Sequence, residues 1–376
     1  MVAFSRNSHS TLSNWWWTVD KPLLVLVSIL MFVGIFLTFS ASPAVAHRVG
    51  FSSYHYVVRQ LAYLPLAFGI MLFLSMQNLK FIRRFACIGF LVAFGLTVLT
   101  LFWGENVKGA ARWIRVCGFS LQPSEFLKPM LAIMAAWLFD AQKQYPEVPG
   151  TWLSVGLLVM TAGLLLKQPD IGMTFVVIVV WLFQLFLNGL SLIWIVGFVL
   201  LGLIGLVTIY FTFPHFHTRV QQFVTSENEL SYQVQKAMNA FQSGGLFGRG
   251  PGEGVAKMSI PDAHTDFIFA VAAEEFGFIL CAMLIAIYGV IVIRTMMISM
   301  KDNNLFIILA ASGLAASFGL QGIINMASSL HLMPTKGMTL PLISYGGSSI
   351  LASAIGIGML LAITRKNAHS EDKDDK

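Results

Sequence analysis

Long apolar runs separated by short polar breaks dominate the pattern along this chain. Because a helix needs about 20 mainly apolar residues to cross the hydrocarbon core of a bilayer, each run predicts a membrane-spanning helix. The expected spans are 23–41, 57–76, 85–103, 124–140, 151–167, 171–188, 190–212, 265–294, 304–328 and 341–364. The predicted fold class is therefore an all-α polytopic membrane protein with ten transmembrane helices, an even number that puts both termini on one side.

The spans divide the chain into three parts. Residues 1–22 precede the first span and include Trp15–Trp17, whose amphipathic rings suit the headgroup layer and predict an interfacial anchor. Residues 23–365 form one transmembrane domain, with a large loop at 213–264 between the seventh and eighth spans. Residues 366–376 follow the last span, and 370–376 mix acids and lysines without apolar residues, which predicts a disordered tail.

Lysines and arginines in the short connections predict the orientation, because cytoplasmic loops carry an excess of them. They gather on the side of the N-terminus, at Lys80, Arg83, Arg84, Arg294, Lys301, Arg365 and Lys366. Both termini and the tail are therefore predicted to be cytoplasmic. The large loop at 213–264 is then extracytoplasmic.

Composition agrees with a membrane protein and excludes several other classes. Hydrophobic residues make up 56% of the chain and charged residues 11%, whereas a soluble domain has about 25% charged residues. The net charge of +6 is spread over loops and tails, so we expect no nucleic-acid surface. Three scattered cysteines are too few for a disulfide framework or a zinc site. The glycine-rich run 244–252 lacks a Gly-Lys-Ser/Thr ending and a preceding strand, which disfavours nucleotide binding.

The stretch 244–275 concentrates charge against a predicted span, and ionisable groups at that depth are expensive enough to indicate a functional site. On one continuous helix, Glu274 lies about 12 Å further along the axis than Asp266 and is rotated about 80° from it around that axis. Glu275 points nearly opposite, so these acids do not form a close carboxylate pair. Asp266 is the candidate for chemistry. The alternative is that Asp266 only sits in the first helical turn, where a carboxylate interacts favourably with the helix dipole.

A second outer connection precedes the fourth span. Here Ser124 follows a proline and precedes Glu125, which predicts a helix start with Ser124 as its cap. Glu125 and Lys128 are three residues apart and can pair on one helix face. Two interpretations are open: a capped entrance with one ion pair, or a site in which Lys128 and Arg112 are cations for an anionic headgroup.

Two other outer connections are less specific. Pro169 and Asp170 are expected to turn the chain and cap the next helix, a structural role. The loop from 213 to 263 includes Arg219 and the glycine-rich run, which we expect to be a flexible outer loop. Loops of more than about 15 residues without regular structure are usually functional or disordered.

Several motifs, in order along the chain, resemble those of the SEDS family, which comprises the FtsW, RodA and SpoVE proteins. They are Gly109–Ile114, Gln122–Glu125, Gln168–Gly172, His264–Ala270 with Glu274–Gly277, Pro334–Gly337 and Leu340–Ser349. The resemblance extends from Leu23 to Arg365, and its last two blocks look more like FtsW than RodA. One departure is Asp262, where the family usually has glutamate.

The resemblance implies ten spans and peptidoglycan glycosyltransferase activity on lipid II, at the outer face of the bacterial inner membrane during septal division. It also implies partners: a class B penicillin-binding protein (an FtsI-like transpeptidase) and other division-machinery membrane proteins. The family's catalytic aspartate corresponds to Asp266. Its substrate-binding cavity corresponds to Arg112, Trp113, Glu125, Lys128, Arg219, His264, Thr265, Lys336 and Ser344.

One carboxylate suffices for such a reaction, because pyrophosphate leaves without being protonated when cations stabilise it; hydrolytic glycosidases usually need two carboxylates. Asp266 would act as general base on the acceptor hydroxyl. A divalent cation, Mg²⁺ or Mn²⁺, would share the neutralisation of charge, although no ligand set in the sequence demands it. The alternatives are a RodA-like elongation polymerase, a lipid II flippase or transporter, and a non-catalytic scaffold. Charges that crowd one face, with nearly uncharged mid-span cores, favour surface chemistry.

Overall fold

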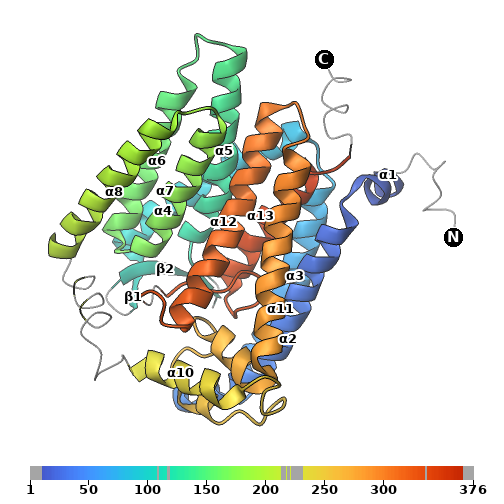
Figure 1. The fold of residues 1–376 in the computed structure, drawn as a ribbon, viewed down its shortest axis with the longest axis vertical. Coiled ribbons are helices and arrows are strands. Elements are labelled where there is room, and N and C mark those ends of the chain that lie inside the picture. Colours follow the sequence, from blue (N-terminus) through green and yellow to red (C-terminus); the bar gives the residue numbers. More distant parts are fainter. Residues whose placement is uncertain are drawn as a thin grey trace.

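In a computed structural model, ten helices of 17 residues or more within the described part of the chain form the body of the protein (Figure 1). The structure describes residues 11–107, 110–116, 119–212, 217, 221, 232–334 and 337–366. The bounds of the ten helices are α2 Lys21–Val49, α3 His55–Ser75, α4 Leu79–Trp103, α5 Ser124–Gln144, α6 Gly150–Lys167, α7 Ile171–Leu187, α8 Leu192–Thr212, α11 Ile268–Ser299, α12 Leu305–Ser329 and α13 Gly347–Ile363. Each one corresponds to a predicted span, so the predicted helical polytopic fold is confirmed.

Six of these helices are long and apolar enough to cross a bilayer by length and composition alone: α2, α3, α4, α6, α11 and α12. Helices α7 and α13 are apolar but have 17 residues each, and the stretch Val196–Thr212 of α8 is also a shorter apolar helix. Helix α5 differs because Glu125, Lys128, Asp140 and Lys143 interrupt its apolar sequence. Most of α5 is buried inside the bundle, including Glu125, Lys128 and Asp140, whereas Lys143 in its last turn is exposed.

The bundle packs closely around α12, whose most apolar window is 78% buried, against 33% for α11. Small residues allow this approach, as is common between membrane helices. A Cβ atom added to Gly322 would lie 2.9 Å from the ring of Tyr288, and one on Gly358 would lie 2.8 Å from the Met71 carbonyl oxygen. Larger side chains at these glycines would force the helices apart.

The two ends of the described chain meet at one end of the bundle. The amide of Lys366, just after α13, donates to the carbonyl of Thr18, the last residue of α1 (Thr11–Thr18), at 3.0 Å. This contact confirms the even number of spans. The disordered tail predicted for 366–376 lies outside the described residues, apart from Lys366.

Helix α1 contains the three tryptophans, and they divide between two environments. Trp15 is buried and donates from its indole nitrogen to Ser75 Oγ at 2.9 Å. The Lys21 ammonium lies 4.8 Å from the ring centre of Trp16 and 4.7 Å from that of Trp17. The predicted interfacial role therefore does not hold for Trp15, which packs against α3; Trp17 is exposed.

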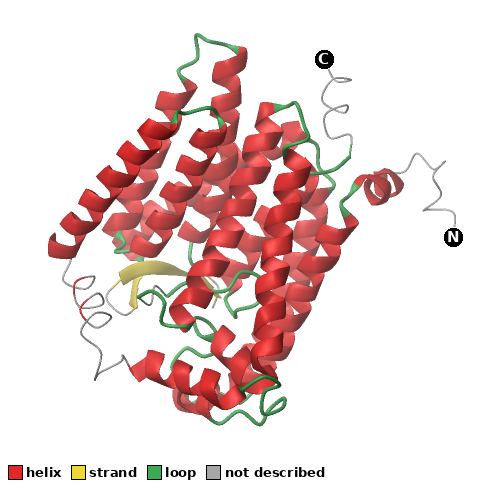
Figure 2. Ribbon diagram, viewed as in Figure 1, coloured by secondary structure: helices red, strands yellow, loops and turns green. Residues whose placement is uncertain are grey.

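The opposite end of the bundle carries short elements that the all-α prediction did not include (Figure 2). Strands β1 (Glu105–Val107), β2 (Ala110–Val116) and β3 (Phe119–Leu121) form an antiparallel sheet in that order. Helix α10 (Tyr232–Gly244) and the 3₁₀ turn η2 (Ala256–Ser259) complete this end. Strands of three residues carry too little periodicity to be recognised in a loop.

Two helix starts differ from the prediction in a way that bears on the site. Helix α11 begins at Ile268, with Phe267 in the cap position, so Asp266 lies in a turn before the helix rather than in its first turn. Helix α13 begins at Gly347 instead of 341. The segment before it, which contains Pro341, is a buried non-helical connection. It passes α2 so closely that a Cβ on Gly34 would lie 2.9 Å from its backbone.

Candidate functional site

A tight turn directs Asp266 into the end of the bundle where the sheet and α10 lie, which the predicted orientation makes the outer end. The amides of Thr265 and Asp266 both donate to the carbonyl of Asp262, at 3.0 and 3.2 Å. Asp262 has a φ of 54°, in the left-handed region where aspartate is among the better tolerated residues. The Asp266 side chain is half-buried.

The backbone of this turn is also hydrogen-bonded to α12 and to the connection before α13. Three consecutive carbonyls, those of residues 264–266, each accept a hydrogen bond from these elements. The bonds run from Asn325 Nδ2 to Asp266 (2.9 Å), from Ser344 Oγ to Thr265 (2.6 Å) and from the Tyr345 amide to His264 (2.9 Å). Ser344, predicted to bind substrate, therefore holds the backbone beside Asp266.

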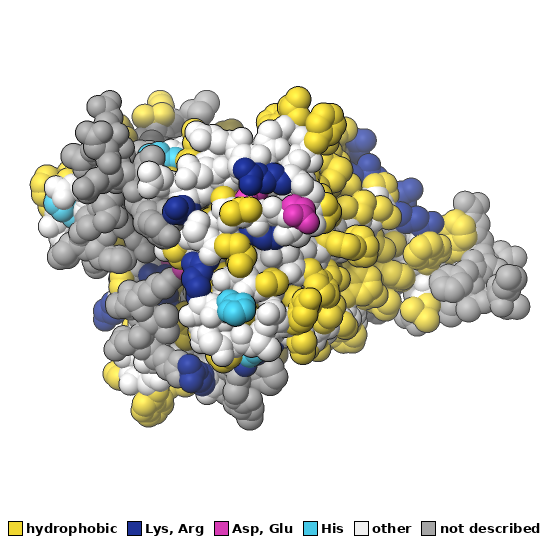
Figure 3. Space-filling model, turned by 90° about the horizontal axis from the view of Figure 1, so that it is seen from below, with side chains coloured by type: hydrophobic (Ala, Val, Ile, Leu, Met, Phe, Trp, Pro, Cys, Tyr) yellow, Lys and Arg dark blue, Asp and Glu magenta, His cyan; other side chains and the backbone are white. Residues whose placement is uncertain are grey.

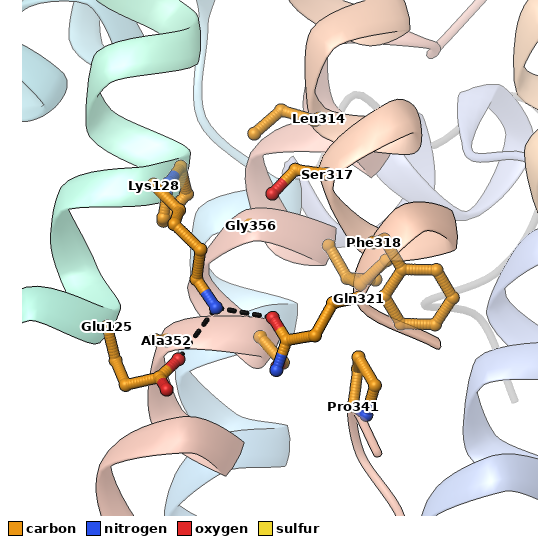
Figure 4. A pocket seen from close by; sticks show the side chains of 12 residues that line it. Glu125, Lys128, Leu314, Ser317, Phe318, Gln321, Pro341, Ala352 and Gly356 are labelled. Carbon is orange, nitrogen blue, oxygen red and sulfur yellow. Dashed lines mark hydrogen bonds and ion pairs between the residues drawn. The ribbon is translucent and has the colours of Figure 1, made fainter. Parts of the chain in front are cut away.

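Lys128 lies deeper, between α5, α12 and α13 (Figure 4). Its ammonium is 2.8 Å from Glu125 Oε2 and donates to Gln321 Oε1; both charged side chains are buried. A cavity of about 30 Å³ opens beside them, which is room for a water molecule. The predicted pairing of Glu125 with Lys128 is confirmed.

The predicted cap of this helix is wrong in detail. Helix α5 begins at Ser124, and Pro123 occupies the cap position without a side-chain hydrogen bond to the helix amides. Ser124 instead accepts a hydrogen bond from Gln122 Nε2 at 3.3 Å. Because proline is suited to a helix start, its fixed φ sets the helix entry here without a side-chain cap.

Arg112 extends from β2 to the break between α6 and α7. Its Nε donates to the Gln168 carbonyl at 2.9 Å, another of its nitrogens donates to the Pro169 carbonyl, and its third lies 3.4 Å from Asp170 Oδ2. Asp170 also caps α7 by accepting from the Met173 amide at 3.1 Å, which confirms the predicted turn and cap. Arg112 thus joins the sheet to this break; its role toward an anionic headgroup stays a prediction.

Glu274 and Glu275 are both buried, and both bind the segment around η2 instead of Asp266. Glu274 accepts from three consecutive amides, those of residues 255–257, at 2.6 to 2.8 Å. Glu275 forms an ion pair with the buried ammonium of Lys257. Both acids therefore serve as packing and pairing groups that hold this segment against α11.

The glycine-rich run is packed against α11, contrary to the flexible loop that was expected. Gly277 interrupts α11 with φ 76° and ψ −172°, a conformation nearly confined to glycine. The backbone of 245–250 fills this break. Loop carbonyls accept from the helix amides of 278 and 279, and loop amides donate to the helix carbonyls of 274 and 275: Phe278 to Gly245 (2.9 Å), Ile279 to Leu246 (3.3 Å), Arg249 to Glu274 (2.9 Å) and Gly250 to Glu275 (3.0 Å).

An aromatic group lies beside the Asp266 turn. The ring of His264 lies 4.2 Å from that of Tyr56 and 5.2 Å from that of Tyr345, measured between ring centres. Tyr345 forms a side-chain hydrogen bond with Arg59. Burial raises the pKa of Tyr345 despite this arginine, so the phenol is neutral at pH 7. Arg59 was not among the predicted site residues, because an arginine at the edge of a predicted span resembles an ordinary end-of-helix charge.

Of the three remaining predicted site residues, the structure describes only Trp113. Trp113 is half-buried in β2, opposite Glu105. Arg219 and Lys336 lie outside the described residues, so their predicted roles stay predictions. Within the described ranges, no three His, Cys, Asp or Glu side chains are arranged to hold a metal ion.

Seen from the outer end, the surface carries lysine and arginine side chains among polar groups, while apolar side chains gather along the flank (Figure 3). The flank of the bundle is apolar, and its outer face is polar and contains the Asp266 carboxylate and the buried Lys128. These features define the class: a polytopic membrane protein with a polar site at one membrane face. The family model described as "Cell cycle protein", for FtsW, RodA and SpoVE, matches residues 21–369. The chain belongs to this family.

Relatives with similar sequences carry one description, probable peptidoglycan glycosyltransferase FtsW. The protein of Caulobacter vibrioides is 42% identical over 365 residues, which cover 97% of this chain and 94% of that one. The protein of Trichlorobacter lovleyi is 36% identical over 357 residues, covering 92% of this chain and 93% of its own. Several motifs read together in the sequence thus identified the family correctly.

Solved structures agree with the fold. A chain from a peptidoglycan synthase complex, studied for the coordination of polymerisation and crosslinking, superposes with a TM-score of 0.77 at 27% identity, covering 93% of this chain and 98% of that one. The crystal structure of the rod shape determining protein RodA of Thermus thermophilus superposes with a TM-score of 0.68 at 27% identity, covering 93% and 97%.

Proposed function

We propose that this chain is an FtsW-like peptidoglycan glycosyltransferase that polymerises lipid II, with Asp266 as the general base. One observation carries the assignment of the base. Among the acids discussed above, Glu125, Glu274 and Glu275 are buried and bound to lysine or backbone amides, whereas Asp266 is half-buried at the mouth of the outer end. Its backbone is held from two sides, so the carboxylate is pre-organised for proton transfer.

The reaction joins two lipid-linked sugars. The 4-hydroxyl of the acceptor's N-acetylglucosamine attacks the anomeric carbon of the donor, and Asp266 takes the hydroxyl proton as the new C–O bond forms. The bond between the anomeric carbon and the diphosphate breaks with its electron pair, so undecaprenyl pyrophosphate departs as an anion. Inversion at the anomeric carbon follows from a single displacement.

The leaving diphosphate needs a cation rather than an acid. Lys128 supplies one: its ammonium has three donors, and the bonds to Glu125 and Gln321 use two of them. No acceptor within the described residues takes the third, which is assigned to a diphosphate oxygen; the cavity of about 30 Å³ that Lys128 lines between α5, α12 and α13 would have to widen to admit the diphosphate. In a site of low dielectric constant, such a contact stabilises developing charge more than it would in water.

The chain is a multi-pass protein of the bacterial inner membrane. Its operation at the division septum, together with a class B penicillin-binding transpeptidase and other division-machinery membrane proteins, belongs to the proposal. The similarity to FtsW proteins and to a chain from a peptidoglycan synthase complex supports it.

Polymerisation of labelled lipid II by the purified chain with its cognate transpeptidase tests the activity. Asp266→Asn keeps the side-chain volume and removes the base, so we expect the rate of glycan formation to fall by about 100-fold or more. Melting temperature and co-purification with the partner should stay unchanged. Normal polymerisation by folded, partner-bound Asp266→Asn protein would refute the assignment, and lipid II translocation without glycan product would indicate a transporter.

A further inference from the structure

Two buried amide side chains on α12 connect the two polar centres of the site, and the mechanism above gives neither of them a role in positioning. Gln321 and Asn325 are four residues apart, so they project from the same face of the helix, one turn from each other. They are 3% and 0% exposed. Burying an amide costs free energy unless it is hydrogen-bonded, so the partners of these two side chains explain why they are there.

Gln321 uses both ends of its amide. Its Oε1 accepts from the Lys128 ammonium, as Figure 4 shows, and its Nε2 donates to the carbonyl of Thr339 at 3.0 Å. Only a neutral amide does both, because a carboxylate would face the Thr339 carbonyl with a second acceptor and an alkyl side chain would offer neither group. The position of the Lys128 ammonium is thus tied to the connection before α13.

Asn325 makes the equivalent contact on the side of the carboxylate. Its Nδ2 donates to the Asp266 carbonyl at 2.9 Å and to the Met338 carbonyl at 2.6 Å, one hydrogen to each. The reverse orientation would place the amide oxygen against two carbonyls, so this arrangement has a single stable orientation. The turn that carries Asp266 is thus tied to the same connection.

These contacts converge on one short piece of chain, because Met338 and Thr339 are adjacent. We propose that Gln321 and Asn325 are positioning residues that set the separation and orientation of the Asp266 carboxylate relative to the Lys128 ammonium. The inference rests on the proposed function, in which one group removes a proton from the acceptor while the other receives the leaving diphosphate. A displacement of about 1 Å at a reacting group is enough to cost about 100-fold in rate.

The chain contains a matched control for this proposal. Gln184 on α7 is also fully buried, and its Nε2 also donates to two carbonyls, those of Ala132 (2.8 Å) and Leu309 (2.9 Å). It therefore has the same hydrogen-bonding pattern as Asn325. The difference is that Gln184 joins α7 to α5 and α12, not to the connection before α13.

Steady-state lipid II polymerisation with the cognate transpeptidase tests the proposal. Asn325→Leu removes the two donated hydrogen bonds, and Gln321→Met removes both the acceptor for Lys128 and the donor to Thr339, each at similar volume. We expect each to lower kcat by about tenfold or more while KM changes by about twofold or less. Asn325→Ser, which keeps one donor, should lose less kcat than Asn325→Leu and provides a second variant if leucine prevents folding. Gln184→Met should lower the melting temperature to a similar extent and leave kcat per folded molecule within about twofold.

The double variant Gln321→Met/Asn325→Leu shows whether the two amides act through the same connection or independently of each other. If both amides act through the Met338–Thr339 connection, its loss of kcat is smaller than the product of the single losses. Multiplicative losses, or equal losses of kcat per folded molecule in Asn325→Leu and Gln184→Met, would overturn the proposal. Asp266→Asn is measured in parallel: activity in that variant refutes the proposed function, whereas an inactive Asp266→Asn beside a fully active Asn325→Leu refutes only the positioning role.

Discussion

The contrast between Asp266 and Glu275 illustrates how single carboxylates near one helix start acquire different tasks. Both come from one charged stretch of sequence, yet Glu275 is 1% exposed and paired with Lys257, while Asp266 is half-buried in a turn. A buried charge without a partner is costly, so Glu275 must keep its lysine. Its ion pair fixes the loop against the helix, and Asp266 is the carboxylate to which we assign the proposed proton transfer.

This interpretation predicts the outcome of breaking that pair. Lys257→Met leaves Glu275 buried without its cation, and we expect a destabilisation of about 3–5 kcal/mol. Thermal unfolding of the purified protein in detergent measures the effect. Restoring neutrality with Glu275→Gln in the same chain should recover part of the lost stability. Equal melting temperatures for wild type and Lys257→Met would show that the pair is not a structural contact.

At the scale of elements, the break in α11 replaces helical hydrogen bonds by contacts with a loop. Amides 278 and 279 would ordinarily donate to carbonyls 274 and 275, and each of these four groups finds a partner in 245–250 instead. The part of α11 before Gly277 carries the Asp266 turn at its start. The glycine-rich loop therefore helps to hold the site, although it contributes no side chain to the proposed chemistry.

A substitution at the break tests this role. A Cβ atom at Gly277 would lie 2.3 Å from the Leu246 carbonyl oxygen, and the positive φ adds about 1–3 kcal/mol of strain. We expect Gly277→Ala to lower both the melting temperature and the polymerisation rate. The matched control is Gly289→Ala in the same helix, where a Cβ meets no atom within 4 Å. Similar behaviour of the two variants would contradict the docking of the loop.

At the scale of the whole molecule, apolar flanks separate two polar ends with different charges and tasks. The end where Thr18 meets Lys366 carries the basic short connections. The opposite end carries the sheet, α10 and the Asp266 turn. An even number of spans and the positive-inside rule assign the first end to the cytoplasm, which puts the site where lipid-linked sugars are polymerised.

Labelling of single cysteines in spheroplasts checks this topology. Phe247 is 79% exposed in the glycine-rich loop, and Tyr145 is 62% exposed after α5. In a chain without its native cysteines, a membrane-impermeant maleimide should label Phe247→Cys in intact spheroplasts and Tyr145→Cys only after lysis. The reverse pattern would invert the orientation and would place Asp266 on the cytoplasmic side.

The length of the apolar runs determined the helical fold in this protein, because a bilayer leaves a long apolar run few alternatives to a spanning helix. Ordered motifs determined the family and selected Asp266, Glu125 and Lys128. Only the tertiary structure decided which carboxylates are buried and paired, because burial and partners depend on chain segments far apart in sequence. It revealed that Gln321 and Asn325 connect Lys128 to the Asp266 turn through Met338 and Thr339. The sequence does not predict which groups these two amides bind. The amide nitrogens donate to backbone carbonyls, and every residue has a backbone carbonyl.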